Sequence, residues 1–212
     1  MRAYKFLREG RVSPFAGTLW PTDEVVESDG GGVDLCRSGV HACRVNRLAY
    51  WLSDELWIVE LDGEIVEDPL KLVAPRGRLV EQVEHWNDDA QLAFAQWCAA
   101  AAAGHAADEL RETGLASAAE LLAGASLGEI AAVATDAAGE AYAAGQPNTA
   151  RVAEYAADAA GAIGPAPATL VAYIAAHTAD ARSGLPGDPF ADERERQSHW
   201  LADHLGLSEA SA

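Results

Sequence analysis

The pattern of apolar and polar residues changes near Trp86. Before this residue, short stretches alternate between the two classes, as in Tyr4-Lys5-Phe6, and the β-branched and aromatic residues of 55–61 form the clearest strand. After it, apolar residues recur about every 3.6 positions, as in amphipathic helices. The sequence therefore predicts an α+β protein. A β-rich domain with a small, mostly antiparallel sheet covers 1–85, and a helical domain over 86–212 packs against it.

Turn signals divide the first domain into short strands. Asp62-Gly63 and Pro75-Arg76-Gly77 each separate two apolar stretches, and Ser38-Gly39 interrupts another. The acidic, glycine-rich stretch 27–32 predicts an exposed loop, and 45–52 suits a short helix. We expect strands at 4–6, 17–21, 33–37, 40–43, 55–61, 64–66, 70–74 and 78–83.

Capping signals divide the second domain into helices. Asn87 provides an N-cap before two aspartates, and Gly114 follows the end of that helix. Ser117 and Ser126 each precede a glutamate by three residues, which is the spacing of a capping box. Asp188-Pro189 starts the last helix. Because 41 of the 127 residues from 86 onward are alanine, the helix axes can approach closely, and we expect a compact bundle of five or six helices.

Charge and composition restrict the partners. The formal net charge of −18 repels nucleic acids and anionic bilayers, whose binding depends largely on Lys and Arg. We therefore expect no nucleic-acid partner. No uncharged apolar stretch is long enough to span a membrane, and the start of the chain does not resemble a signal peptide, so we expect no membrane association.

Cysteine and lysine usage bear on the compartment and the source. The three cysteines are an odd number in a chain without a secretory signal, which favours reduced thiols and a cytoplasmic location. Lys5 and Lys71 are the only lysines, and arginine fills the other basic positions. Together with the abundant alanine, this usage indicates a bacterial genome of high GC content.

Cysteine and histidine residues cluster in one short segment. Cys36, His41 and Cys43 could supply three zinc ligands, with Cys98 or His85 as the fourth. The spacing lacks the paired C-x-x-C halves of zinc sites, so we expect no metal and interpret the cysteines as small buried hydrophobic residues.

A catalytic interpretation of the same segment is open. His41 and Cys43 lie two residues apart, so on a strand they share a face and could act as base and nucleophile. They are the candidate catalytic residues. Trp20 and Arg44 are candidate ligand-binding residues of the same domain.

The last helix has two polar residues on its apolar stripe. Arg194 and Gln197 follow Phe190 and precede Leu201 at helical spacing. Because buried polar groups need partners, this pair either joins the helix to the N-terminal domain as a clasp or helps to line a pocket for an anion or carboxylate.

Segments of both domains resemble uncharacterised proteins. Gly39-Val40-His41-Ala42-Cys43, with Tyr4-Lys5-Phe6 and 17–21 before it and Leu56-Trp57-Ile58-Val59-Glu60 after it, resembles bacterial and phage proteins with a G-x-H-A-C β-domain and an alanine-rich helical C-terminus. Residues 193–207 are similar to the end of alanine-rich actinobacterial proteins. Neither resemblance implies an activity.

The order of the predicted elements is also similar to small ADP-ribosyltransferase-like domains, which bind NAD between two small sheets. The similarity implies that His41 and Arg44 lie near the nucleotide, and that Glu81 or Glu84 is the acidic residue. The family's first-strand histidine or arginine has no identified counterpart in this sequence.

Two functions follow as expectations. The first is a binding or interaction module whose partner is a small molecule or a protein, with a bundle that covers the sheet or forms a homodimer. The alternative is an NAD-dependent ADP-ribosyltransferase-like enzyme with a cleft between the N-terminal sheet and the last helix. The sequence identifies no cofactor for the first function.

Overall fold

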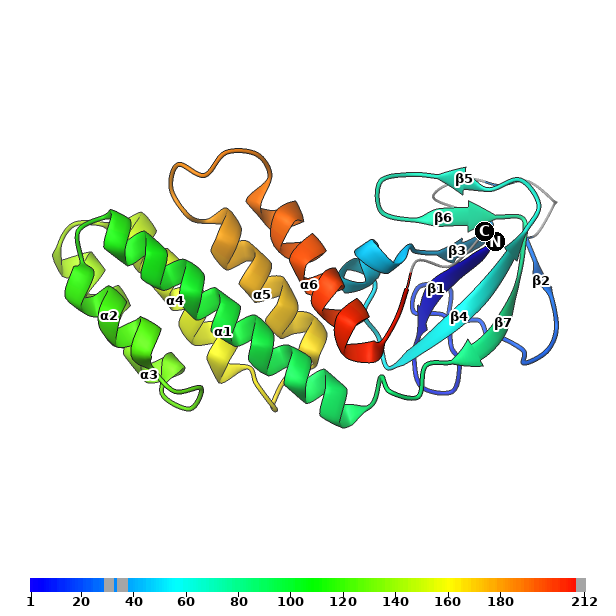
Figure 1. Cartoon of the computed structure of the whole chain (residues 1–212), viewed down its shortest axis with the longest axis horizontal. Coiled ribbons are helices and arrows are strands. Elements are labelled where there is room, and N and C mark those ends of the chain that lie inside the picture. The colour runs from blue at the N-terminus through cyan, green and yellow to red at the C-terminus, as the bar shows by residue number, and fades with distance from the viewer. Residues whose placement is uncertain (29–32, 34–37, 209–212) are drawn as a thin grey trace. The chain divides into compact units, whose positions relative to one another are not determined.

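The computed structural model describes residues 1–28, 33 and 38–208, and Figure 1 shows their elements. The fold is α+β, with antiparallel strands first and α-helices afterwards, as the change in periodicity predicts. The chain divides into two compact units, of which unit 1 comprises 1–88 and 197–212 and unit 2 comprises 89–196. The second boundary falls inside the last helix, whereas the sequence assigned all residues after 85 to one domain.

The larger sheet of unit 1 has the strand order β1-β4-β7-β2, with all neighbours antiparallel. Its strands are β1 (Arg2–Leu7), β2 (Val26–Glu27), β4 (Glu55–Asp62) and β7 (Arg76–Gln82). β1 pairs with β4 along its whole length, from Arg2 opposite Glu60 to Leu7 opposite Glu55. A bulge between Ile58 and Val59 shifts the register of β4 against β7.

The smaller sheet has the order β3-β6-β5 and meets the larger one at β1. Its strands are β3 (Val40–Ala42), β5 (Val66–Glu67) and β6 (Leu72–Ala74). Tyr4 of β1 and Cys43, just after β3, exchange two backbone hydrogen bonds of 2.9 and 2.8 Å. A short 3₁₀-helix, η1 (Val45–Tyr50), follows at once. The junction places the middle of β1 beside β3, which decides the burial of Lys5.

Hydrogen bonds to η1 and β1 explain why the end of the chain belongs to unit 1. The Ala49 amide donates to Ser198 Oγ at 3.0 Å, and the Tyr4 hydroxyl donates to the Ser208 carbonyl at 2.7 Å. Trp86 packs edge-on against Phe6, with 5.8 Å between ring centroids. The central apolar cluster of this unit consists of Ala3, Leu7, Trp20, Val40, Ala42, Val59, Leu61, Leu72, Ala74 and Leu79.

The helical region contains six α-helices in the described part of the chain. They are α1 (Asp88–Glu112), α2 (Ala116–Gly124), α3 (Ile130–Ala143), α4 (Pro147–Gly161), α5 (Ala168–Asp180) and α6 (Pro189–Leu205). Within unit 2, α3 packs against α2 and α4, and α4 packs against α5. Most buried positions of these helices are alanine, as the composition predicts. Among the described residues, no helix is long and apolar enough to cross a membrane.

Local predictions differ in their outcome. Asp188 Oδ1 accepts from the Ala191 amide at 2.9 Å, so this capping signal is correct. The Ser126 amide donates to Glu129 Oε2 at 2.9 Å as in a capping box, but α3 begins only at Ile130, with Glu129 as its N-cap. Ser117 is not a cap, because α2 begins at Ala116 directly after the turn that ends α1. The strand predicted at 17–21 is wrong, since only Leu19 forms an isolated bridge there. The strand predicted at 33–37 lies almost entirely outside the described residues.

Candidate ligand pocket

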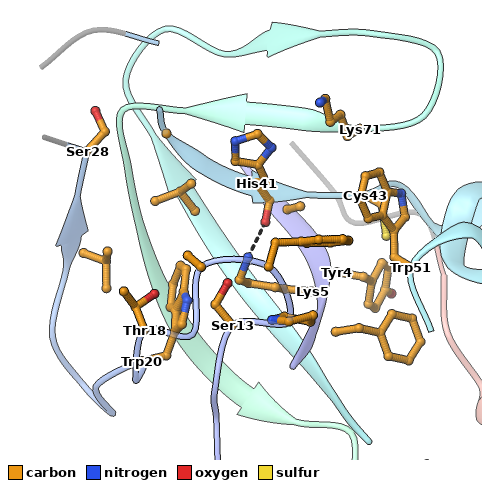
Figure 2. A pocket seen from close by; sticks show the side chains of 18 of the residues that line it. Tyr4, Lys5, Ser13, Thr18, Trp20, Ser28, His41, Cys43, Trp51 and Lys71 are labelled. Atoms are coloured by element: carbon orange, nitrogen blue, oxygen red, sulfur yellow. Dashed lines mark hydrogen bonds between the residues drawn. The ribbon is translucent and has the colours of Figure 1, made fainter. Parts of the chain in front are cut away.

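A pocket of about 630 Å³ lies in unit 1 beside the strand where the two sheets meet (Figure 2). Residues of β1, β2 and β3 form its walls together with the loop 13–20, and Trp51 and Lys71 complete them. The volume falls within the range of small-molecule sites, which is about 300–1,000 Å³. Its position follows from the junction at Tyr4, which holds β3 beside β1.

Aromatic side chains form much of the pocket wall. Trp20 is buried, whereas Phe15 in the neighbouring loop is 86% exposed. Phe15 meets Trp51 edge-on, with 6.2 Å between the ring centroids. Tyr4 and Phe6 contribute from β1. Such a wall offers flat apolar faces on which a planar ligand can pack.

Lys5 is a buried cation in this pocket. Alternation along β1 would put its side chain opposite Tyr4 and Phe6, but both faces of the strand are covered and Lys5 is only 9% exposed. Its ammonium donates to the His41 carbonyl at 2.7 Å, which is the dashed line in Figure 2. The ammonium also lies 4.7 Å from the centroid of the Trp20 ring. Burial lowers the pKa of Lys5 to about 8, and among the described residues it forms no ion pair.

His41 occupies the polar position of β3, half-buried between two buried neighbours. Burial lowers the pKa of its imidazole, the positive charges of Lys71 and Lys5 lower it further, and Asp68 opposes them. The ring is therefore neutral at neutral pH and can both donate and accept a hydrogen bond.

Cys43 lies at the same pocket but is fully buried. Burial raises the pKa of its thiol to about 12, although the nearby Lys5 acts in the opposite direction. The thiol is thus protonated at neutral pH, which suits a packing residue better than a nucleophile. The catalytic roles of His41 and Cys43 stay predictions.

Arg44 does not line the pocket that holds Trp20 and His41. Its guanidinium forms two hydrogen bonds with the Glu67 carboxylate, of 2.6 and 2.8 Å, and both side chains are exposed. Arg44 lines a smaller cavity of about 190 Å³, whose wall shares Lys71 with the larger one. Of the four site candidates of the first domain, the structure therefore brings together Trp20, His41 and Cys43 at one pocket and leaves Arg44 outside it.

Arg194 and Gln197 are both buried on α6, where the unit boundary separates them. Neither residue lines either of the two pockets. Their roles as a clasp or as an anion site stay predictions. Glu81 and Glu84, which the transferase similarity implies as acidic residues, also lie outside both pocket walls.

The proposed zinc ligands include Cys36, which lies outside the described residues. Within the described part of the chain, no group of three or more His, Cys, Asp or Glu side chains is placed to hold a metal ion.

Lys5 and Lys71 are two pocket residues that the sequence did not indicate as site residues. They are the only two lysines of the chain, and both line the same pocket. This usage was visible in the sequence, but we interpreted it as a property of the genome. Only the tertiary fold shows that the two positions converge.

Comparisons with known proteins add no assignment. No family model, no curated protein and no solved structure matches this chain. Inference about function therefore depends on the pocket itself.

Proposed function

We propose that this protein is a binding module whose unit 1 holds a small, planar organic molecule in the pocket beside β1. The observation that carries the proposal is the composition of the wall, which combines aromatic rings, among them Trp20 and Trp51, with polar side chains, among them Lys5 and His41. Specific small-molecule sites combine an apolar wall with a small number of polar groups that orient the ligand.

The proposal favours binding over catalysis. Cys43 is the nucleophile that the sequence indicated, and its buried thiol is protonated at neutral pH. The neutral ring of His41 can hydrogen-bond a ligand as a donor and as an acceptor.

Ligand titration followed by tryptophan fluorescence and by ¹H–¹⁵N NMR tests this function. Suitable probes are indole-3-acetate, indole-3-acetamide, nicotinamide and adenosine. We expect at least one probe to saturate and to shift the amides of Lys5, Trp20 and His41. Phe15→Ala removes an exposed wall residue and should weaken binding several-fold, because it deletes contact area without opening the core.

Leu19→Ala is the matched control. Leu19 is an exposed apolar residue of the same loop that does not line the pocket. Its truncation should leave the affinity unchanged. The proposal is wrong if no probe perturbs the pocket amides, or if Leu19→Ala weakens binding as much as Phe15→Ala.

An NAD-dependent transferase is the second candidate, and one observation favours it. The pocket lies where two small sheets meet, and ADP-ribosyltransferase-like domains bind NAD in such a place. The reaction would break the bond between nicotinamide and ribose and transfer ADP-ribose to an acceptor, with His41 near the nucleotide. This remains an analogy of fold.

Thermal unfolding with NAD and with ADP-ribose tests the second candidate. A ligand in large excess over its dissociation constant raises the stability by RT ln(1 + [L]/Kd), so millimolar NAD should raise the unfolding temperature measurably. Chromatography should then detect released nicotinamide. If NAD neither stabilises the protein nor loses nicotinamide, the transferase is excluded while the binding module stands.

A further inference from the structure

The distribution of the two basic residue types singles out this pocket. Of the 15 Lys and Arg residues only two are lysine, so 13 are arginine, and both lysines line the pocket wall. An ammonium is a compact charge that fits a narrow space, whereas a guanidinium is a wide planar fork. This pocket is therefore the place where the chain uses a compact cation.

The surroundings of Lys5 leave part of its hydrogen-bonding capacity for another group. An ammonium has three N–H donors, and the described residues provide one acceptor, the His41 carbonyl. The Trp20 ring faces the charge at 4.7 Å. Keeping a cation out of water without a carboxylate partner costs free energy, and an anion bound in the pocket would offset that cost.

The other titratable groups around Lys5 make the wall cationic. Glu27 on β2 is the one carboxylate among the lining residues that the structure describes, and it is exposed to solvent. Lys71 adds a positive charge, although its ammonium lies 3.7 Å from Asp68. His41 is neutral at neutral pH, and raised pKa values keep the groups of Tyr4 and Cys43 protonated. A positive site in a chain of net charge −18 is locally selective for an anion.

We propose that the ligand of this pocket is a planar organic anion whose charged group binds the Lys5 ammonium while its ring packs on the aromatic wall. This proposal rests on the proposed function and specifies its ligand class. The anion accepts one or more of the Lys5 N–H bonds, and the neutral His41 ring is one of the side chains that line the same pocket.

Binding of matched acid and amide pairs tests the charge directly. The pairs are indole-3-acetate with indole-3-acetamide, and nicotinate with nicotinamide, which differ little in shape but by one charge. We expect each acid to bind at least tenfold more tightly than its amide at neutral pH, because a charge-assisted hydrogen bond replaces a neutral one. Lys5→Met should abolish this preference and retain binding of the amide, while Lys71→Met should reduce it less.

A second measurement follows the Lys5 side chain of the wild-type protein directly. In protein labelled with ¹³C-lysine, the two lysines give two side-chain signals, and Lys71→Met assigns them. Titration with pH should show that indole-3-acetate raises the pKa of Lys5 above its value of about 8, whereas indole-3-acetamide leaves it unchanged. The affinity for the acid should accordingly fall as the pH rises above that value.

The outcomes separate the two proposals. If neither member of any pair binds at the pocket, the binding module itself is wrong. If acid and amide bind equally, or the pKa of Lys5 does not change, the pocket binds ligands but the anion proposal is overturned. A preference that survives in Lys5→Met and disappears in Lys71→Met also overturns it, because the charge is then recognised at the other lysine.

Discussion

Two buried charges, Glu193 in unit 2 and Lys5 in unit 1, have contrasting surroundings. In unit 2 the buried Glu193 carboxylate accepts hydrogen bonds from Arg196 at 2.6 and 2.8 Å, and its Oε2 lies 3.1 Å from His105 Nε2. In unit 1 the buried Lys5 ammonium has only a backbone carbonyl and a tryptophan ring among the described residues. A buried charge that is hydrogen-bonded to side chains around it stabilises the structure. A buried charge that faces a cavity with unused N–H donors is suited to bind a ligand.

The difference extends to packing. Unit 2 fills its interior mainly with alanine side chains, which let the helices approach closely. Unit 1 packs large aromatic and aliphatic side chains between two small sheets, and both pockets described above lie there.

The largest expected effect concerns a property that both units have, a buried thiol. Burial raises the pKa of Cys43 in unit 1 to about 12 and also raises that of Cys98 in unit 2. Three pKa units above the ordinary value reduce the thiolate about a thousandfold, so iodoacetamide should alkylate both at least a hundredfold more slowly in folded than in urea-unfolded protein.

Mass spectrometry of a Cys36→Ser variant measures the two alkylation rates separately. Equal rates for Cys43 in folded and unfolded protein would contradict its burial and would support the nucleophile that the sequence indicated.

The next effect is the pH dependence of stability caused by Lys5. Its pKa is about 8 in the folded protein and near 10.5 in the unfolded chain, so below pH 8 the ammonium is charged in both states and burial destabilises the fold. Between about pH 8 and 10.5 only the unfolded chain holds the proton, and this cost is relieved. The free energy of unfolding of the wild type should therefore rise relative to Lys5→Met by about 3 kcal/mol over this window.

Urea unfolding followed by tryptophan fluorescence measures this change, because five of the six tryptophans lie in unit 1. At neutral pH we expect Lys5→Met to be the more stable protein by about 1–2 kcal/mol, since the lost hydrogen bond and ring contact offset part of the gain. If the stability difference between the wild type and Lys5→Met does not vary with pH, Lys5 has an ordinary pKa and an ion partner.

Removing the buried Glu193 carboxylate of unit 2 should change the stability in the opposite direction to Lys5→Met. Glu193→Ala leaves His105 and Arg196 without their shared acceptor and creates a cavity, so it should destabilise unit 2 by about 2 kcal/mol. The cost stays moderate because the Arg196 side chain is half exposed and remains hydrated. Far-UV circular dichroism in urea measures it, with the exposed Asp158→Ala as control. If Glu193→Ala stabilised the protein as Lys5→Met is expected to do, the contrast between the units would fail.

The smallest effect is expected at the exposed pair of unit 1. Arg44→Ala removes two hydrogen bonds to Glu67, but exposed ion pairs contribute little, so the stability should fall by less than about 1 kcal/mol. Probe affinity should not change, because Arg44 lies outside the larger pocket. A tenfold loss of affinity for indole-3-acetate in this variant would restore Arg44 as a ligand-binding residue.

Much of the architecture could be predicted because it depends on local patterns. The β-branched residues of 55–61 became β4, and the signals at Ser126 and Asp188 lie at the starts of helical segments. The predicted strand at 17–21 failed because its residues lie in a loop that lines the pocket instead of pairing along a sheet. Trp20 and His41 could be identified as site residues from their residue types, because tryptophan and histidine side chains bind ligands at many sites.

What the sequence alone determined is the order of elements, the change from pleated to helical periodicity, the alanine packing and the strongly acidic charge. The tertiary structure alone decided that β3 lies beside β1, and that two lysines 66 positions apart in the chain line one cavity. Periodicity describes which face of an element is apolar, but it does not contain the distances between elements. The burial of Lys5, and with it the candidate site, arises from such a distance.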